Sequence, residues 1–236
     1  MTWSIIARDN TTGQIGIAVA TRFFAVGARV PHIAARVGGI ATQALVNPYY
    51  GIDGVKLLRE GHQPRDVVDT LIAGDAGRES RQLHIMDASG RIACHTGKEC
   101  VDWYGHVAGD GFSIAGNMLA GPRVLDDTAK AYAANENLPF AQRLLAAIRS
   151  GEAAGGDRRG RQSAALLIHG EEEWSDLDLR VDDHADPLQE LERLEHVSRE
   201  RWVHFRKFLP TRGNPAGITD RKTIDASIEA AIAGRK

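Results

Sequence analysis

The start of this 236-residue chain places the strongest constraint on its fold. Residues Trp3–Asp9 and Gln14–Thr21 are both rich in side chains that favour β-strands. Between them, the run Asn10–Gly13 consists of residues typical of tight turns. The two runs therefore predict an antiparallel hairpin, and the N-terminus is expected to be held inside a sheet.

Thr2 stands directly behind Met1, at the beginning of the first predicted strand. If Met1 is removed, one residue carries both a hydroxyl and a free α-amine. An α-amine has an ordinary pKa of about 7.7–8.0, so near neutral pH it can accept the proton of the hydroxyl beside it. Thr2 is therefore a candidate nucleophile for an amide hydrolase. The alternative is that threonine stands second by chance.

Further elements follow from local composition and spacing. Strands are predicted at His32–Val37, Gly39–Leu45, Arg81–Asp87, Arg91–His95, Gln162–His169 and Trp174–Val181. Helices are predicted in two pairs, first Gly54–Glu60 with a segment that opens at Pro64, then Pro122–Ala133 with Pro139–Ser150. This order indicates an α+β fold in which two stacked sheets lie between two helical layers.

The C-terminal part of the chain is expected to be a helical extension, residues 187–236, beyond a first domain of residues 1–186. Asp186, Pro187 and Gln189 have the pattern of a helix start, and the helix is predicted to run to about Phe208. A linker and a short helix over residues 224–233 should follow. The side chains expected to be buried are Leu191, Leu194 and Trp202. The extension is expected to support a homo-oligomer, most simply a dimer.

Charge and hydropathy exclude several kinds of partner. The 29 Lys and Arg residues nearly balance 31 Asp and Glu residues, so the net charge of −2 gives no general attraction for nucleic acid. No apolar run approaches the roughly 20 residues of a membrane span, and no signal peptide is evident. We expect a cytoplasmic protein with reduced thiols at Cys94 and Cys100.

Two segments near the predicted hairpin contain candidate site residues. Arg22 follows the second strand and could orient a carboxylate or lower the pKa of the Thr2 amine. The run Gly38–Tyr50 contains small residues that let a ligand approach the backbone. Gln43 and Asn47 in this run are candidate substrate contacts, and an ordinary turn at Asn47-Pro48 is the alternative.

Two later segments add further candidates. Gly116 and Asn117 mark a strand end before a helix, where Asn117 offers both a donor and an acceptor. The basic, glycine-rich loop of residues 155–165 contains Asp157, Arg158 and Arg161, which could bind a substrate carboxylate. A helix cap and a solvated loop are the respective alternatives.

The run Asp182-Asp183-His184 has side chains that can bind metals. Consecutive residues of an extended segment point to opposite faces, however, and no histidine or cysteine pair with ligand spacing supports a site. We therefore expect no metal and no cofactor.

The chain closely resembles a widespread bacterial family, domain of unknown function family 1028, which is grouped with the N-terminal-nucleophile (Ntn) hydrolases. The matching motifs are TWSIIARDNTTGQIGIAVATRFFAVGARVP, ATQALVNPYYG, AGNMLAGP, GGDRRGRQSAAL and DLRVDDHADP. The resemblance implies a four-layer αββα sandwich, with Thr2 as the nucleophile after loss of Met1.

The resemblance also shows a departure from proteasome-like relatives, in which a lysine and an aspartate assist the nucleophile. Their places fall near Arg36 and Ala20. Alanine cannot accept a hydrogen bond and arginine does not deprotonate, so the Thr2 amine would have to act with Asn117, Asp157 and the loop arginines.

The resulting expectation is an amidohydrolase that cleaves a small amide, such as a carboxylate-bearing amino-acid derivative or a peptide-like metabolite. Arg36 is included among the substrate contacts. The alternative is a non-enzymatic binding or assembly protein that retains the Ntn fold.

Overall fold

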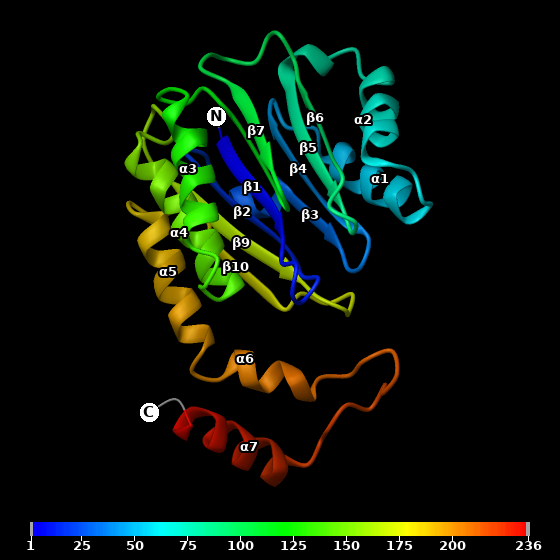
Figure 1. Cartoon of the computed structure of the whole chain (residues 1–236), viewed down its shortest axis with the longest axis vertical. Coiled ribbons are helices and arrows are strands. Elements are labelled where there is room, and N and C mark those ends of the chain that lie inside the picture. The colour runs from blue at the N-terminus through cyan, green and yellow to red at the C-terminus, as the bar shows by residue number, and fades with distance from the viewer. Residues whose placement is uncertain (1, 235–236) are drawn as a thin grey trace. The chain divides into compact units, whose positions relative to one another are not determined.

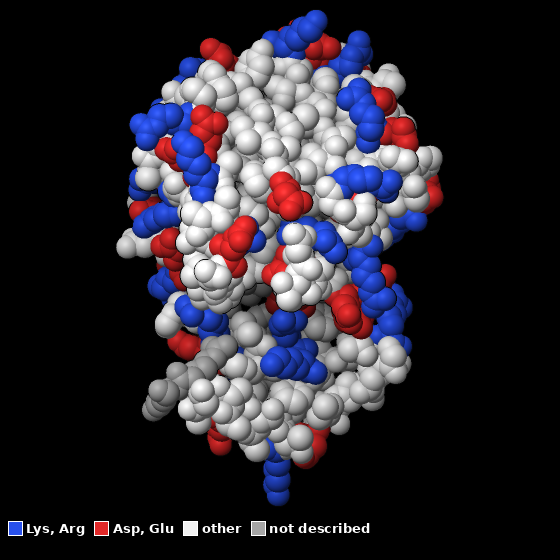
Figure 2. Space-filling view, viewed as in Figure 1, with Lys and Arg blue, Asp and Glu red and all other residues white. Residues whose placement is uncertain are grey.

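The computed structural model describes residues 2–234 (Figure 1), and these divide into two compact units after Leu191. The boundary predicted at residue 186 lies close to this division. The face seen in Figure 2 carries basic and acidic side chains interspersed, in keeping with the small net charge. Within residues 2–234, no helix combines the length and apolar character that crossing a bilayer requires.

The first unit contains two antiparallel sheets. The larger has the strand order β10 (Leu177–Val181), β9 (Ser163–His169), β2 (Ile15–Thr21), β1 (Thr2–Arg8), β8 (Phe112–Asn117) and β7 (Gly105–Gly109). The smaller has the order β3 (Pro31–Ala34), β4 (Gly38–Ala44), β5 (Arg81–Asp87) and β6 (Ile92–Thr96). Strands β1 and β5 both contact strands of the opposite sheet, so the two sheets face each other.

The predicted N-terminal hairpin is confirmed. Strands β1 and β2 pair antiparallel, with Trp3 opposite Ala20. In the turn, the Asp9 carboxylate accepts the backbone N–H groups of Thr11 and Thr12 at 2.7 and 2.9 Å. Gly13 adopts a φ of 74°, which glycine tolerates without steric cost. This hairpin places Thr2 at the beginning of β1, an interior strand of the larger sheet.

The sequence prediction missed a second hairpin, β7 and β8. Both strands are short and contain glycine, which weakens the strand signal that composition provides. The prediction also extended β3 to Val37, whereas the strand ends at Ala34. Arg36 explains this difference, because its φ of 61° turns the chain toward β4.

Helices cover the outer faces of both sheets (Figure 1). The smaller sheet contacts α1 (Pro48–Arg59) and α2 (Pro64–Ala73), and the larger contacts α3 (Arg123–Ala134) and α4 (Phe140–Ala153). Short 3₁₀ turns occur at Val26–Ala28 and Arg78–Ser80. Helix α1 begins at Pro48, before the predicted start at Gly54, because Asn47 caps it by accepting the Tyr49 N–H at 3.1 Å.

Alternation along the strands separates two apolar layers. Outward-facing Ile40, Leu83 and Ile85 pack with side chains of α1 and α2. Inward-facing Ile6 and Ile17 belong to a cluster between the sheets. This period of two is what a strand buried on both faces requires.

The predicted helix over residues 187–208 is wrong in its length. Helix α5 (Pro187–Ser198) ends early, and α6 (Trp202–Phe205) continues directly into a 3₁₀ turn, Arg206–Phe208. The Ser198 hydroxyl donates to the Glu195 carbonyl at 2.7 Å, a local bond that competes with helix continuation. Leu191 is buried, whereas Leu194 and Trp202 are only half-buried.

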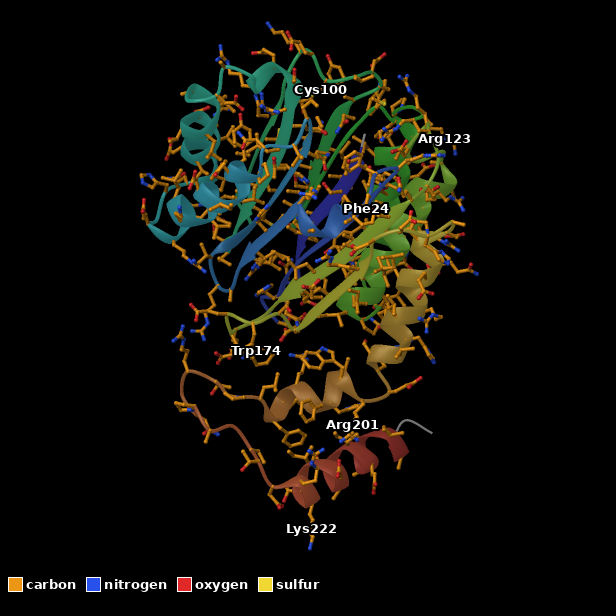
Figure 3. All side chains as sticks on the ribbon, turned by 180° about the vertical axis from the view of Figure 1, so that it is seen from behind. Phe24, Cys100, Arg123, Trp174, Arg201 and Lys222 are labelled. Atoms are coloured by element: carbon orange, nitrogen blue, oxygen red, sulfur yellow. The ribbon has the colours of Figure 1, made fainter. Side chains whose placement is uncertain are left out.

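The second unit ends in helix α7 (Arg221–Ala233), which begins slightly before its predicted start. Asp220 caps this helix by accepting the Thr223 N–H at 3.0 Å. Arg201, at the start of α6, forms an ion pair with Asp225 of α7 at 2.6 Å (Figure 3). The unit is therefore held by capping and by contacts among its own helices.

Candidate active site at the N-terminal threonine

A cavity of about 550 Å³ opens where four strand ends meet in the first unit. It lies at the start of β1, the end of β2, the end of β4 and the end of β8, which contribute Thr2, Thr21, Gln43 and Asn117. Thr2 lies directly opposite Asn117 in the sheet register. Most of the remaining wall is apolar, and includes Val26, Val30, Leu45, Val46, Val101 and Met118.

Thr2 is held tightly at this cavity. The residue is only 7% exposed, and its Oγ1 lies 3.1 Å from Oγ1 of Thr21. The Thr2 carbonyl faces Gln43 Nε2 and Asn117 Nδ2, each at 3.4 Å. The nucleophile predicted from sequence thus lies at a pocket wall, with its backbone oriented by side chains of both sheets.

The amide of Asn117 has a defined orientation. Its Nδ2 faces two oxygen acceptors, the Thr2 carbonyl and Gln82 Oε1 at 3.1 Å. Because both N–H groups are used in this way, Oδ1 is the atom that remains to accept a hydrogen bond. In a chain that begins at Thr2, this oxygen is a suitable partner for the α-ammonium group.

Backbone strain is concentrated at the cavity. Among the described residues, four other than glycine have positive φ, and two of them, Ala44 at 71° and Met118 at 56°, line the cavity. Such conformations cost about 1 kcal/mol or more and persist where surrounding structure imposes them. Ala44 is the last residue of β4 and Met118 directly follows β8, and this position at two strand ends indicates a wall shaped for something other than stability.

Asp157 organises the neighbouring loop. It is 3% exposed, and its carboxylate accepts the backbone N–H groups of Arg22 at 2.7 Å and of Arg159 at 2.8 Å. The Arg159 guanidinium also pairs with it at 3.2 Å. Asp157 is thereby engaged, and Arg159 is the residue of this loop that lines the cavity.

Other candidates from the sequence lie outside the cavity lining. Arg36 donates to the Glu171 carbonyl at 2.9 Å, and Arg161 forms ion pairs with Glu152 and Asp186. Arg22 donates to the Arg159 carbonyl, and Arg158 is exposed. Their guanidinium groups therefore do not gather around Thr2 as the sequence suggested.

Asn47 and Gly116 also have structural positions. Asn47 caps α1 and donates to Asp75 at 3.3 Å. Gly116 faces away from Asn117, since neighbours on a strand alternate. A Cβ at Gly116 would lie 2.6 Å from Leu119 and 2.9 Å from Trp3, so close packing explains this glycine.

The sequence prediction missed two arginines of the wall, Arg29 and Arg81. Arg81 pairs with Asp75 at 3.1 Å. Burial opposes ionisation of Asp75, but hydrogen bonds from Tyr50, Gly77 and Arg81 outweigh it and lower the pKa of Asp75 to about 2. Arg29 follows a 3₁₀ turn and lies within the first motif of the family resemblance, but neither its residue type nor its neighbours singled it out as a site residue.

A chain of buried hydrogen bonds leads from the cavity into the space between the sheets. Gln43 Nε2 faces three acceptors, Gln82 Oε1 at 2.8 Å, the Ala115 carbonyl at 3.1 Å and, less closely, the Thr2 carbonyl at 3.4 Å. Its Oε1 must therefore accept the hydroxyl proton of Ser4, at 2.8 Å. Because Ser4 has donated its proton, it can only accept from His84 Nε2, at 2.9 Å.

The direction of every later hydrogen bond follows from this one. With its proton on Nε2, neutral His84 accepts at Nδ1 from Ser113 Oγ, at 2.8 Å. Ser113 then accepts from His106 Nε2 at 3.1 Å, and His106 Nδ1 accepts from the Cys94 thiol at 3.2 Å. Both histidines are thereby fixed as the Nε2–H tautomer.

Burial keeps these histidines neutral. It lowers the pKa of His84 to about 3, with a smaller contribution from His106, and it lowers the pKa of His106 as well. Burial also raises the pKa of the Cys94 thiol. Each group is therefore uncharged near neutral pH, as the hydrogen-bond directions require.

The side chains of Asp182, Asp183 and His184 are engaged locally. Asp182 pairs with Arg180, Asp183 accepts from Gln162, and His184 Nδ1 accepts the Asp186 N–H. No group of three or more His, Cys, Asp or Glu side chains suited to a metal ion occurs within residues 2–234.

Comparison with solved structures gives a similar protein from Silicibacter pomeroyi. That crystal structure, assigned to the same family described below, is 34% identical, with a TM-score of 0.87 over 93% of this chain and 96% of that one. Anbu (ancestral beta-subunit) from Yersinia bercovieri matches at 11% identity and a TM-score of 0.43, over 83% of this chain and 94% of that one. None of the curated proteins matches the chain.

The family comparison covers most of the first unit. The model for the "Family of unknown function (DUF1028)" matches residues 2–191, which include Thr2, Asn117 and Asp157. The chain therefore belongs to the DUF1028 family.

Proposed function

We propose that this protein is an N-terminal-nucleophile amidohydrolase in which Thr2, after removal of Met1, attacks a small amide. One observation carries the proposal: the Thr2 hydroxyl lies at the wall of a cavity large enough for a small molecule. The two strained residues at the wall and the orientation of Asn117 support it.

The layer arrangement supports the same proposal. Helices α1 and α2 contact one sheet, α3 and α4 contact the other, and the sheets contact each other. We interpret this arrangement as the four-layer αββα sandwich of Ntn hydrolases. In that interpretation, the first residue of the processed chain begins a central strand and its hydroxyl faces the space between the sheets.

The α-amine of Thr2 is the proposed base. Among the described residues, no His or Lys lines the cavity, and Asp157 is already engaged by two backbone N–H groups. The amine would take the Oγ1 proton as the oxygen forms a bond to the amide carbon. The resulting ammonium would then give its proton to the leaving nitrogen as the C–N bond breaks.

Water completes the reaction. The departure of the amine leaves an ester between Thr2 and the acyl group. The same α-amine would remove a proton from water, which attacks the ester carbon and releases a carboxylic acid and free Thr2. Asn117 Oδ1 would accept a hydrogen bond from the ammonium and hold it beside the reacting atoms.

The test is acylation of Thr2 by a β-lactone, an electrophile that reacts with activated hydroxyls. Intact mass should report loss of Met1 and gain of one acyl group, and peptide mapping should place that group on Thr2. We expect no labelling for Thr2→Ala and reduced labelling for Thr2→Ser, which keeps the hydroxyl and loses a methyl. The matched control Thr11→Ala changes an exposed hydroxyl in the hairpin turn and should leave labelling unchanged.

A form that retains Met1 separates the amine from the hydroxyl. Met1 would acylate the α-amine, so this form should not be labelled although it folds normally. Equal labelling of both forms would remove the amine as the base. A processed chain that binds small molecules but is never acylated would favour the alternative, a binding protein that retains the fold.

We also propose that the C-terminal extension contributes to self-association. Ile218 and Ile232 of the second unit are 44% and 42% exposed, so these two apolar side chains are accessible to a partner subunit. Light scattering of the full chain and of a form ending at residue 209 would test this. The same oligomer mass for both forms would contradict it.

A further inference from the structure

We infer that the cavity at Thr2 takes amides that carry an apolar acyl group on one side and a carboxylate on the other, with Arg29 as the residue that selects the carboxylate. This inference rests on the proposed function for the position of the scissile amide. It is carried by a separate observation, the pairing of the charged groups that line the cavity.

Three arginines line the cavity, and two of them already have carboxylate partners. Arg81 pairs with Asp75 at 3.1 Å, and Arg159 pairs with Asp157 at 3.2 Å. The third, Arg29, behaves differently. Its guanidinium forms no ion pair and no hydrogen bond with any residue that the structure describes. Arg29 is therefore the guanidinium of this wall that can engage a new anion.

Among the described residues that line the cavity, Glu99 carries the carboxylate. Glu99 accepts the Ser80 hydroxyl at 2.8 Å and is exposed. It has no ion pair with Arg29. In the processed chain, the Thr2 ammonium would add another positive charge to the cavity. The charges of the wall thus favour an anionic ligand over a cationic one.

The wall next to Arg29 is apolar. Val26 and Val30 flank it in sequence and line the same cavity, with Val101 and Met118 contributed by other segments. Apolar surface of this kind gains about 0.8 kcal/mol for each methylene that it removes from water, or about fourfold in affinity. A guanidinium at its edge binds carboxylates through two parallel hydrogen bonds. An N-acyl amino acid has both features and an amide between them.

Binding to a Thr2→Ala variant isolates recognition from turnover. The probes are N-acetyl-, N-hexanoyl- and N-decanoyl-leucine, each compared with its C-terminal carboxamide, by isothermal titration calorimetry. We expect the acids to bind at least about tenfold more tightly than the carboxamides, because a charge-assisted pair is lost. We also expect affinity to rise with acyl length until the acyl group fills the apolar part of the cavity.

Two additional substitutions, both at Arg29, test whether this side chain causes the preference for the acid. Arg29→Ala in the Thr2→Ala background should remove the preference for the acid, and Arg29→Lys should retain part of it. Arg158→Ala is the matched control, since Arg158 is also an exposed arginine but lies outside the cavity lining. Thermal unfolding of each variant would establish that it folds.

The outcomes separate this inference from the proposed function. Selective binding of the acids, lost in Arg29→Ala alone, supports the inference even if the wild-type chain cleaves none of them. Equal binding of acids and carboxamides, equal effects of the Arg29 and Arg158 substitutions, or no binding of any probe would overturn it. The result of the Thr2 acylation test does not depend on any of these binding outcomes.

Discussion

The space between the two sheets has an apolar half and a polar half, although both are built on the same strands. In the apolar half, Ile6, Ile17 and Met86 pack without polar partners. In the polar half, Ser4 and His84 occupy the neighbouring inward positions of β1 and β5. Both halves consist of inward-facing residues from both sheets. What separates them is their position along the strands.

The comparison shows that equal burial produces different demands on sequence. An apolar layer requires volume and shape, which several aliphatic side chains can supply. The polar half requires that each donor meet an acceptor. Each hydrogen bond from Gln43 to Cys94 fixes the direction of the next one. One incorrect group in such a chain leaves its neighbours unsatisfied at low dielectric. The polar half ends at Thr2, whereas the apolar half reaches the same cavity through Val26 and Val30.

The largest expected difference between the halves concerns His84. Replacing it by leucine keeps the volume but removes the acceptor of the Ser113 hydroxyl and the donor to Ser4. We expect a loss of about 4 kcal/mol in the free energy of unfolding, measured by urea titration. The control His62→Leu changes an exposed histidine and should cost under about 0.5 kcal/mol. A loss for His84→Leu below about 1 kcal/mol would show that the polar half behaves like the apolar one.

The second difference is pH dependence. The pKa of His84 is about 3 in the folded chain and near 6.5 when unfolded, so between these values only the unfolded chain binds the proton. Stability should therefore fall as pH decreases through this window, by about 2 kcal/mol between pH 6.5 and 4.5. The lowered pKa of His106 acts in the same direction.

A variant identifies the source of that pH dependence. The glutamine of His84→Gln can donate to Ser4 but does not titrate. The slope of the unfolding free energy against pH should therefore decrease by the contribution of about one bound proton. An unchanged slope would assign the effect to other groups, His106 first. Nitrogen NMR of the wild-type chain should also show both histidines as the Nε2–H tautomer.

The smallest expected effect belongs to the apolar half. Ile17→Val removes one methylene from a fully buried side chain, and should cost about 1 kcal/mol. Because Ile17 packs in a cluster of apolar side chains, the cost should be the same at pH 7 and pH 5. A cost that changes with pH would show that the two halves are coupled.

Several features of the fold were available from the sequence. The hairpin of β1 and β2 follows from two strand-forming runs around Asn10–Gly13, and the Asp9 carboxylate in the turn acts as such residues do elsewhere. Strand β5 has its predicted bounds, Arg81–Asp87. The hairpin of β7 and β8 was missed, and only the end of β8 at Gly116 and Asn117 was expected, because glycine and short length reduce the local signal of these strands.

The candidate site was only partly available from the sequence. Thr2 and Asn117 were identified by type and position, and the structure places both at one cavity. Arg36 and Arg161 were expected near substrate, but each has partners elsewhere. Arg29 lies within the first motif of the family resemblance but was not singled out, since the role of a surface arginine becomes evident only when its neighbours and its ion pairs are known.

The sequence by itself determined most of the elements, the N-terminal hairpin above all, and the identity of Thr2 as a possible nucleophile. These depend on turn chemistry and periodicity, which act over a few residues. Only the tertiary structure decided that Ser4 meets Gln43 and His84, and that Thr2 shares a wall with Arg29. Such contacts join residues far apart in the chain, and they are set by how the two sheets stack rather than by any local preference.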